Sequence, residues 1–305
     1  PRAVADAVAE PAPDRPPRLP KGSFRPKQSL GQNYLQDNNY AKKIVDAVQD
    51  GSDRGSRVVE LGPGLGALTR LLAQDYPEML AVELDERAVD ILREEYPAPL
   101  SIIQGDVLAV DYSKVAELRG GRLSVVGNLP YYITSQILFC LCDHHAAVRR
   151  AVVTMQWEVA QRLVAAPRTR DYGILSVVFQ LYATPKIAFK IPPTAFYPQP
   201  KVTSALVVVD FPENRALFPV DPRKLRTVIT TAFQQRRKML RQSLKPILNG
   251  NPCPEAYATR RPEELAPREF LDLTGAIFGF SEEEPDVSGK AIWRNAKLRK
   301  DGGGR

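Results

Sequence analysis

The feature that most constrains the fold of this chain is the regular alternation of short apolar runs with segments of helical periodicity. Runs of strand length, each bounded by turn residues, lie at residues 57–61, 79–84, 100–104 and 123–127. Segments in which apolar residues recur at helical spacing lie at residues 38–49, 67–75, 86–96 and 134–143. This alternation predicts an α/β domain whose sheet is mostly parallel and carries helices on both faces.

The pattern changes twice further along the chain. Additional strands are predicted at residues 151–156, 177–183 and 205–211. A proline-rich segment at residues 191–200, which no helix can cross, separates the last two, so we expect an antiparallel end to the sheet. Helical periodicity follows at residues 222–233, 237–248 and 267–278. We therefore predict an α/β domain over residues 27–211 and a small all-helical domain over residues 212–280.

Both ends of the chain lack the patterns of a packed domain. Residues 1–26 contain seven prolines and few large apolar side chains, which predicts a disordered leader. Residues 281–305 predict a flexible, charged tail. Intact transit peptides contain few acidic residues, so the acidic residues of this leader argue against one. They fit better with the remnant that stays after a targeting peptide is cleaved. We expect the protein to be located in an organelle (plastid or mitochondrion) after removal of a targeting peptide, with the bacterial cytoplasm as the alternative location.

Composition excludes several classes of protein. No apolar run approaches the roughly 20 residues that a membrane span needs. Three cysteines cannot form a disulfide framework, and Cys140 and Cys142 are predicted to be small core residues. We expect no metal site, because a zinc site needs more ligands than two adjacent histidines supply. His144 and His145 are expected to lie on the surface at the end of a helix. The net charge of +7 is compatible with a polyanionic partner.

A glycine loop follows the first predicted strand of the sheet and opens a helix. Gly62, Gly64 and Gly66 allow positive φ angles and let a ligand approach the backbone closely. Their GxGxG spacing differs from the GxGxxG of a dinucleotide-binding fold. Glycine loops of this kind also serve plain packing, so the loop alone does not identify a ligand.

Acidic residues lie at the ends of three successive predicted strands. Glu60, Glu83 and Asp106 would border one crevice, because the carboxyl ends of parallel strands meet at one edge of a sheet. A carboxylate after the second strand can accept hydrogen bonds from ribose hydroxyls, and one after the third from an adenine amino group. An acidic crevice suits a sulfonium cation and would repel a pyrophosphate. This contrast favours S-adenosyl-L-methionine over a nicotinamide cofactor.

The fourth strand runs into Asn128, Leu129, Pro130 and Tyr131, the most informative tetrapeptide in the chain. Adenine's amino group is a poor nucleophile, because its lone pair is delocalised into the ring. The Asn128 side-chain oxygen and the Leu129 carbonyl oxygen would accept its two hydrogens and favour a more pyramidal nitrogen. Tyr131 would stack on the extruded base. The tetrapeptide therefore predicts methyl transfer to an exocyclic amino group by positioning and electrostatics.

In this order and at these spacings, the motifs resemble those of the ribosomal RNA adenine N6,N6-dimethyltransferases of the KsgA type, in their bacterial or organellar branch. The resemblance covers roughly residues 24–280 and also includes residues 32–35, 196–202 and 233–238. It implies a Rossmann-like class I methyltransferase sheet, mostly parallel with an antiparallel last strand, and a small C-terminal all-helical domain. It further implies dimethylation of two adjacent adenines in the 3′-terminal hairpin of small-subunit rRNA, coupled to small-subunit biogenesis.

The resemblance also assigns roles to individual residues. Expected to bind S-adenosyl-L-methionine are Gln32, Asn33, Leu35, Gly62, Gly64, Glu83, Leu84, Asp106, Val107 and Asn128. Expected at the target adenine are Asn128, Leu129, Pro130, Tyr131 and Phe196, with the Phe196 ring on the face of the base opposite Tyr131. Tyr132 departs from many relatives, which carry a smaller or more polar residue there.

A basic stretch at residues 223–245 holds eight cationic residues and no acidic one. Without interspersed carboxylates, these cations are not arranged for pairing along a helix, so we expect them to contact phosphates. We expect RNA contacts from Arg236, Arg237, Lys238, Arg241 and Lys245, mostly on one helical face, and from Lys201 at the rim. The expected partners are small-subunit rRNA and the assembling small ribosomal subunit, no membrane is expected, and the protein is expected to be a monomer.

Three other functions remain open at this point. The same fold could methylate adenines of large-subunit rRNA or DNA, although DNA amino-methylases more often carry Asn-Pro-Pro-Tyr. It could serve as a non-catalytic ribosome-assembly or transcription factor, which the intact Asn128 and Tyr131 disfavour. A nicotinamide dehydrogenase would need an acid such as a histidine near the crevice, and His144 and His145 lie at the wrong end of a helix.

Overall fold

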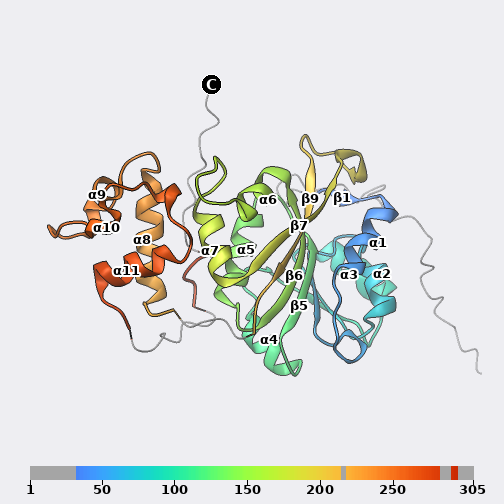
Figure 1. Cartoon of the computed structure of the whole chain (residues 1–305). Helices are drawn as coiled ribbons and strands as arrows, with labels where there is room; N and C mark the ends of the chain where they lie inside the picture. The colour runs from blue at the N-terminus through green and yellow to red at the C-terminus, as the bar shows by residue number, and fades with distance from the viewer. Residues whose placement is uncertain (1–31, 214–217, 282–289, 295–305) are drawn as a thin grey trace, which may run out of the picture.

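The computed structural model describes residues 32–213, 218–281 and 290–294, and its largest element is a seven-stranded sheet (Figure 1). The strand order is β4-β3-β2-β5-β6-β9-β7. The strands are β2 (Val58–Leu61), β3 (Leu80–Glu83), β4 (Ser101–Gln104), β5 (Leu123–Asn128), β6 (Val148–Gln156), β7 (Thr184–Ile191) and β9 (Ser204–Asp210). Neighbouring strands from β4 to β6 are parallel, whereas β9 runs antiparallel to both β6 and β7. The predicted mostly parallel sheet with an antiparallel end is confirmed.

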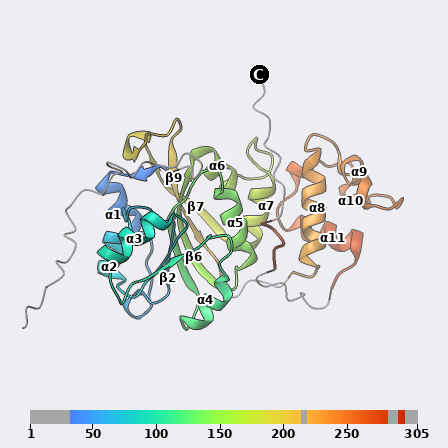
Figure 2. The ribbon, with the colours of Figure 1, turned by 180° about the vertical axis from the view of Figure 1, so that it is seen from behind.

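Helices cover both faces of this sheet (Figure 2). Val126 and Val152 point into one apolar cluster and their neighbours Val125 and Val153 into another, because successive side chains of a strand alternate between faces. The first cluster receives buried residues of α1 (Asn38–Asp46), α2 (Thr69–Asp75) and α3 (Glu86–Glu95). The second receives residues of α4 (Tyr112–Leu118), α5 (Thr134–Asp143), α6 (Trp157–Val164) and α7 (Ile174–Tyr182). Cys140 and Cys142 lie in this second cluster, as predicted.

The strand predicted at residues 177–183 is wrong, because these residues belong to helix α7. Nearly all side chains of α7 are buried, so its apolar residues form a continuous run that a short buried strand would also show. The missing strand is β7, which begins directly after α7 at Thr184 and forms the edge of the sheet. Its alternating exposed and covered residues and its Pro185 are typical of an edge strand.

The helical part of the chain after β9 is built around α8 (Pro222–Gln234), which packs against α11 (Glu269–Phe278) and α7. Asp221 caps α8 by accepting a hydrogen bond from the backbone N–H of Arg223, with Pro222 in the first turn. The single helix predicted at residues 237–248 is wrong. Pro246 is incompatible with a continuous helix, and the segment forms α9 (Leu240–Ser243) and a 3-10 turn, η4 (Lys245–Ile247). The remaining elements are α10 (Glu255–Ala258), η2 (Asp53–Gly55), η3 (Pro193–Ala195) and η5 (Pro262–Glu264).

Part of the predicted flexible tail is packed against the α/β domain. The carboxylate of Asp143, at the end of α5, accepts hydrogen bonds from the backbone N–H groups of Ile292 (3.2 Å), Trp293 (2.8 Å) and Arg294 (3.2 Å). The Trp293 indole is 1% exposed, and its N–H donates to the Tyr182 hydroxyl at 3.2 Å. The flexible-tail prediction is therefore wrong for residues 290–294. The rest of the tail and the predicted leader at residues 1–26 lie outside the described residues.

A small two-stranded sheet closes one side of the pocket described below. Strand β1 (Tyr34–Leu35) pairs antiparallel with β8 (Phe196–Tyr197), so that Tyr34 lies opposite Tyr197. This pairing holds the segment before α1 against the proline-rich segment that follows β7. None of the helices within the described residues is long and apolar enough to cross a membrane.

Candidate active site

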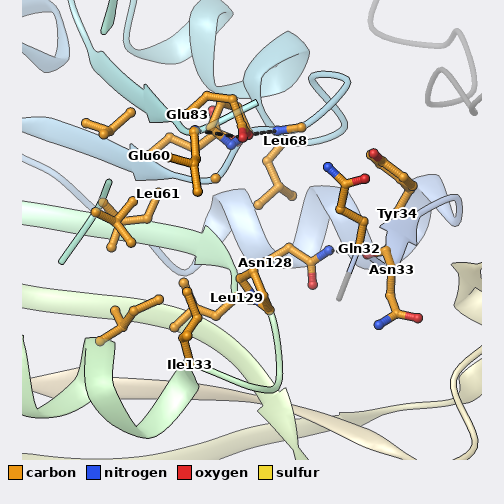
Figure 3. Close-up of a pocket in the computed structure, with 18 of the residues that line it drawn as sticks. Gln32, Asn33, Tyr34, Glu60, Leu61, Leu68, Glu83, Asn128, Leu129 and Ile133 are labelled. Atoms are coloured by element: carbon orange, nitrogen blue, oxygen red, sulfur yellow. Dashed lines mark hydrogen bonds between the residues drawn. The ribbon is translucent and has the colours of Figure 1, made fainter. Parts of the chain in front are cut away.

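A pocket of about 960 Å³, including its open mouth, lies at the carboxyl ends of the central parallel strands (Figure 3). Strands β2, β3 and β5 end at it, and the segment before α1 forms its opposite wall. The lining residues are Gln32, Asn33, Tyr34, Leu35, Glu60, Leu61, Gly62, Pro63, Gly64, Ala67, Leu68, Val82, Glu83, Leu84, Asp106, Val107, Asn128, Leu129, Pro130, Tyr131, Tyr132, Ile133 and Ile137. Every residue predicted to bind the cofactor is in this set.

The glycine loop after β2 leaves backbone facing open space. Gly62 has a φ of 64°, and a side chain built on it would meet no atom within 4 Å. Gly64 has a φ of 57°, and a Cβ there would come within 3.1 Å of the Tyr34 ring. Both positions therefore favour glycine for conformational reasons, and Gly62 also keeps the pocket floor clear for a ligand.

Glu83, the last residue of β3, is held by three backbone N–H groups. It accepts hydrogen bonds from Gly64 (2.9 Å), Leu84 (2.8 Å) and Asp85 (2.8 Å). Burial raises the pKa of the Glu83 carboxyl, and these three hydrogen bonds oppose the increase by favouring the charged form. Glu83 thus connects the glycine loop to the end of β3 and fixes a carboxylate at the pocket wall. The dashed lines in Figure 3 include its bond to the loop.

The carboxyl of Glu60, one of the three acidic residues predicted at the crevice, is buried. Its side chain is 1% exposed and accepts a 2.8 Å hydrogen bond from the Thr69 hydroxyl. Burial raises the pKa of Glu60 to about 8, so this carboxyl is mostly protonated at neutral pH. Glu60, Glu83 and Asp106 all line the pocket, as predicted, and burial favours the neutral form of the Glu60 carboxyl. The exposed Asp106 accepts a hydrogen bond from the backbone N–H of Leu108 at 2.9 Å.

The side-chain amide of Asn128, at the end of β5, is held from two sides. Its Nδ2 donates to the backbone carbonyl oxygen of Asn33 at 2.8 Å, and its Oδ1 accepts from the Thr154 hydroxyl at 2.6 Å. Figure 3 shows Asn128 extending from its strand toward the segment that carries Gln32 and Asn33. Thr154 is fully buried on β6, the neighbouring strand. The amide therefore has one orientation, and Oδ1 keeps a lone pair for a further hydrogen.

The residues after Asn128 shape the mouth of the pocket. Leu129 is 2% exposed, and the carbonyl oxygen of Pro130 accepts a 2.9 Å hydrogen bond from the Thr134 hydroxyl. The hydroxyl of half-buried Tyr131 shares a 2.6 Å hydrogen bond with Ser204 on β9. Tyr131 is thereby fixed at one edge of the pocket, whereas the neighbouring Tyr132 is 56% exposed.

Phe196, predicted on the face of the base opposite Tyr131, does not line the pocket. Its ring is 1% exposed and packs in the apolar cluster beneath α1 and α2, together with Leu35 and Leu206. In this conformation no base can reach it. The residue that β8 exposes is Tyr197, at 44%.

Sequence reasoning missed several lining residues. Tyr34, Leu68, Ile133 and Ile137 contribute apolar walls, and Tyr132 lies at the mouth. Apolar residues beside a motif give no signal of their own, because the same residues would fit a packed core. Tyr34 is an exception, because its position inside the motif at residues 32–35 could have indicated that it belongs to the site.

The predicted RNA-binding cations do not share one helical face. Arg236 lies in the turn after α8, where its guanidinium donates to Glu263 Oε2 (2.7 Å) and to the carbonyl oxygen of Thr169 (2.7 Å). Arg236 therefore links the turn after α8 to the chain around Glu263 and around Thr169. The other predicted cations are exposed and spread over the turn, α9 and η4, with Lys201 before β9: Arg237, Lys238, Arg241, Lys245 and Lys201.

The two histidines are not a surface pair. His144 is 2% exposed, its Nδ1 lies 3.1 Å from the Ser113 hydroxyl, and its ring packs edge-on against Tyr112. Burial lowers the pKa of His144, which keeps the imidazole neutral. Within the described parts of the chain, no group of three or more histidine, cysteine, aspartate or glutamate residues is arranged to hold a metal ion.

Comparison with known proteins identifies the family. The family model of the ribosomal RNA adenine dimethylases matches residues 23–260. The ribosomal RNA small subunit methyltransferase A of Salinibacter ruber is 43% identical over 266 residues, which are 87% of this chain and 89% of that protein. The protein of the same name from Chlorobaculum tepidum is 41% identical over 248 residues, 81% of this chain and 87% of that protein.

Solved structures support the fold. A dimethyladenosine transferase from Plasmodium falciparum superposes with a TM-score of 0.66 at 22% identity, over 79% of this chain and 95% of that one. The 23S rRNA methyltransferase ErmE superposes with a TM-score of 0.55 at 24% identity, over 80% and 99%. S-adenosylmethionine, the predicted cofactor, is the methyl donor of this family, and the glycine loop, Glu83 and Asp106 suit it. The chain belongs to the ribosomal RNA adenine dimethylase family.

Proposed function

We propose that this protein dimethylates the N6 amino groups of two adjacent adenines in the 3′-terminal hairpin of small-subunit rRNA, during small-subunit assembly. The observation that carries the proposal is the position of Asn128. Its fixed amide lies in the same pocket as the glycine loop and Glu83 on one side and Tyr131 on the other. A methyl donor and an extruded base would meet there. The names of the bacterial relatives favour the small subunit as substrate.

The cofactor half of the pocket suits S-adenosylmethionine, which supplies an electrophilic methyl group on a sulfonium centre. Gly62 and Gly64 let it approach the backbone after β2. The Glu83 carboxylate retains a lone pair on Oε2 that can accept a hydrogen from a ribose hydroxyl. Asp106, exposed at the end of β4, can accept a hydrogen from the adenine amino group of the cofactor. These carboxylates favour a cationic ligand over a pyrophosphate.

The target half of the pocket activates a weak nucleophile by holding its hydrogens. Asn128 Oδ1 and the Leu129 carbonyl oxygen accept the two N–H groups of the adenine amino group, which favours a pyramidal nitrogen with an available lone pair. Thr154 and Asn33 hold the amide in place before the base arrives, so little reorganisation is needed. Stacking on Tyr131 contributes roughly 1–3 kcal/mol to holding the base.

A methylation assay tests this proposal directly. Purified protein, radiolabelled S-adenosylmethionine and small subunits that lack the modification should yield N6,N6-dimethyladenosine, detected by mass spectrometry of digested rRNA. Large subunits and duplex DNA are the controls for the alternative substrates, one of which the name of the structural neighbour ErmE indicates. A product on large-subunit rRNA or on DNA, with none on small subunits, would overturn the proposal.

We also propose a monomer that works in the bacterial cytoplasm. The two relatives described above are bacterial proteins, which favours this compartment over an organelle. Light scattering of the purified protein measures the oligomeric state. A molar mass of twice that of the chain would contradict the proposed monomer.

A further inference from the structure

A short turn at residues 106–109 follows β4 and brings Asp106 to the pocket. Two local bonds close this turn. The backbone N–H of Leu108 donates to Asp106 Oδ1, and the backbone N–H of Ala109 donates to the Asp106 carbonyl oxygen, each at 2.9 Å. Within the described residues, Asp106 Oδ2 has no hydrogen-bond partner, so this oxygen is available to a ligand.

Two donors from outside the turn hold two of its remaining carbonyl oxygens. The buried Tyr112 hydroxyl, at the start of α4, donates to the carbonyl oxygen of Val107 at 2.9 Å. The Arg294 guanidinium donates to the carbonyl oxygen of Leu108 at 3.0 Å, and the Cys140 thiol approaches the same oxygen only to 4.0 Å. Arg294 comes 186 residues after Leu108. A distant part of the chain therefore supplies a charged donor to the turn, and hydrogen bonds from charged donors are the stronger ones.

Arg294 is itself fixed by the packing of the C-terminal segment. The Asp143 carboxylate accepts a 3.2 Å hydrogen bond from the backbone N–H of Arg294 and lies 3.6 Å from its Nε. The neighbouring Trp293 is buried beside α7, where the segment runs in both ribbon views (Figure 1, Figure 2). The guanidinium therefore reaches Leu108 from a backbone whose position is set by the core.

We propose that Arg294 is a positioning residue for the cofactor, because it holds the turn that presents Asp106 to the adenine amino group of S-adenosylmethionine. The inference rests on the role given to Asp106 in the proposed function. It adds a contribution of the C-terminal segment, which lies beyond the residues matched by the family model, since those end at residue 260. A turn that is held before the ligand binds loses less entropy on binding, so loss of the Arg294 bond should weaken cofactor binding.

The charge of Arg294 would have the opposite effect if it acted through electrostatics alone. S-adenosylmethionine carries a sulfonium cation, so removal of a nearby positive charge would tighten its binding by Coulomb's law. S-adenosylhomocysteine lacks this cation and keeps the adenine. A positioning role therefore predicts weaker binding of both ligands, whereas a purely electrostatic role predicts tighter binding of S-adenosylmethionine alone.

Isothermal titration calorimetry of the full chain with both ligands tests the inference. We expect Arg294→Ala to raise each dissociation constant about three- to tenfold. Arg294→Lys keeps a charged donor for the Leu108 carbonyl oxygen and should restore most of the affinity. Trp293→Ala removes the anchor of the segment but leaves Arg294 in the chain, so it should weaken binding to a similar extent. Lys114→Ala, which removes an exposed cation from α4, is the matched control and should bind both ligands as the wild type does.

A double-mutant cycle with Asp106→Asn locates the effect. This substitution keeps an oxygen for the Leu108 N–H and replaces the other carboxylate oxygen by an amide nitrogen, which cannot accept the hydrogen of an adenine amino group. In this background, Arg294→Ala should change the dissociation constants less than about twofold, because the effects of coupled residues do not add.

Three results would overturn the inference: unchanged affinities in Arg294→Ala, tighter binding of S-adenosylmethionine alone, or equal losses of affinity with and without Asp106→Asn. Each of them is measured without RNA and leaves wild-type methylation untouched. A wild-type protein that binds both ligands but forms no dimethyladenosine on small subunits would instead overturn the proposed function and leave the positioning role of Arg294 standing.

Discussion

The side-chain amide of Asn128 donates a 2.8 Å hydrogen bond to the backbone carbonyl oxygen of Asn33, 95 residues earlier in the chain. This bond joins the end of a central strand to the segment that closes the opposite wall of the pocket. The bond uses Nδ2 of the amide, and the Thr154 hydroxyl donates a hydrogen bond that orients Oδ1. The group proposed to hold the target adenine is thus oriented by the cofactor side of the pocket.

Replacement of Asn128 should separate catalysis from binding. Asn128→Ala removes the acceptor proposed for the adenine amino group, and we expect the methylation rate to fall about 10²-fold or more. Binding to small subunits should stay nearly unchanged, because phosphate contacts elsewhere dominate affinity. A methylation assay and a subunit pull-down measure the two effects, with exposed Asn39→Ala on α1 as the control. Equal losses in both assays would mean that the two functions are not separable at this site.

Thr154 is predicted to be a positioning residue. Thr154→Val keeps the shape of a buried side chain but removes the hydroxyl that bonds to Asn128 Oδ1. We expect kcat to fall about tenfold, with little change in KM for the subunit and a loss of about 1 kcal/mol in stability. Thr154→Ser should restore most of kcat, because it restores the hydroxyl. A change confined to KM would contradict this role.

Glu60 should make stability depend on pH. Its pKa of about 8 in the folded protein lies above the value of about 4.3 expected in the unfolded chain. The folded state therefore binds more protons between these two values. The Glu60 contribution to stability is fully present below about pH 4 and is lost as pH rises toward 8, at up to about 1.4 kcal/mol per pH unit.

Urea denaturation at pH 5.5, 6.5 and 7.5 measures this dependence. Glu60→Gln keeps an acceptor for the Thr69 hydroxyl and cannot ionise. We expect the variant to lose less stability than the wild type over this pH range. Parallel stability profiles for the two proteins would show that Glu60 is ionised in the folded state.

Trp293 should stabilise the whole α/β domain. Its indole is 1% exposed, stacks near Phe139 and donates to Tyr182, so Trp293→Ala should lower the free energy of unfolding by about 3 kcal/mol. Trp157→Ala is the control, because Trp157 is only partly buried and contacts Lys190. Thermal and urea denaturation compare the two. An unchanged stability in Trp293→Ala would show that the C-terminal segment is not docked in solution.

Arg236 and Arg237 should respond differently to charge reversal. Arg237→Glu changes an exposed side chain, so RNA affinity should fall and the salt dependence should become weaker while stability is kept. Arg236→Glu also breaks the ion pair with Glu263 and the bond to the Thr169 carbonyl oxygen, and it should destabilise the fold. Filter binding and differential scanning calorimetry distinguish these outcomes. Loss of affinity without loss of stability in both variants would place Arg236 on the RNA surface.

The parts of the molecule that sequence reasoning predicted well are set by local rules. A glycine loop such as that at Gly62, or an acidic residue at a strand end such as Glu83, has its position fixed by the chain immediately around it. Parallel strands then bring these positions to one edge of the sheet. This is why the residues predicted to bind the cofactor all line one pocket.

The parts that were missed depend on distant contacts. The run at residues 177–183 fits a strand or a buried helix equally, and only its surroundings select α7. In the sequence, Arg236 looks like its basic neighbours, and only the fold brings Glu263 next to it. Phe196 looks like a residue that could stack on a base, but its place on β8 directs its ring into the core. Trp293 follows a charged segment, and no pattern near it indicates that Asp143 binds its backbone.

That bond to Asp143 has a consequence for how the protein is made. The residues that complete the Asp143 site leave the ribosome 150 residues after Asp143 itself. Until then, the end of α5 exposes a carboxylate and an uncovered apolar face to the nascent-chain environment, where chaperones and proteases act. Final packing around the end of α5 therefore waits until almost all the described chain has been translated, and a polypeptide truncated before Ile292 would carry that exposed surface permanently.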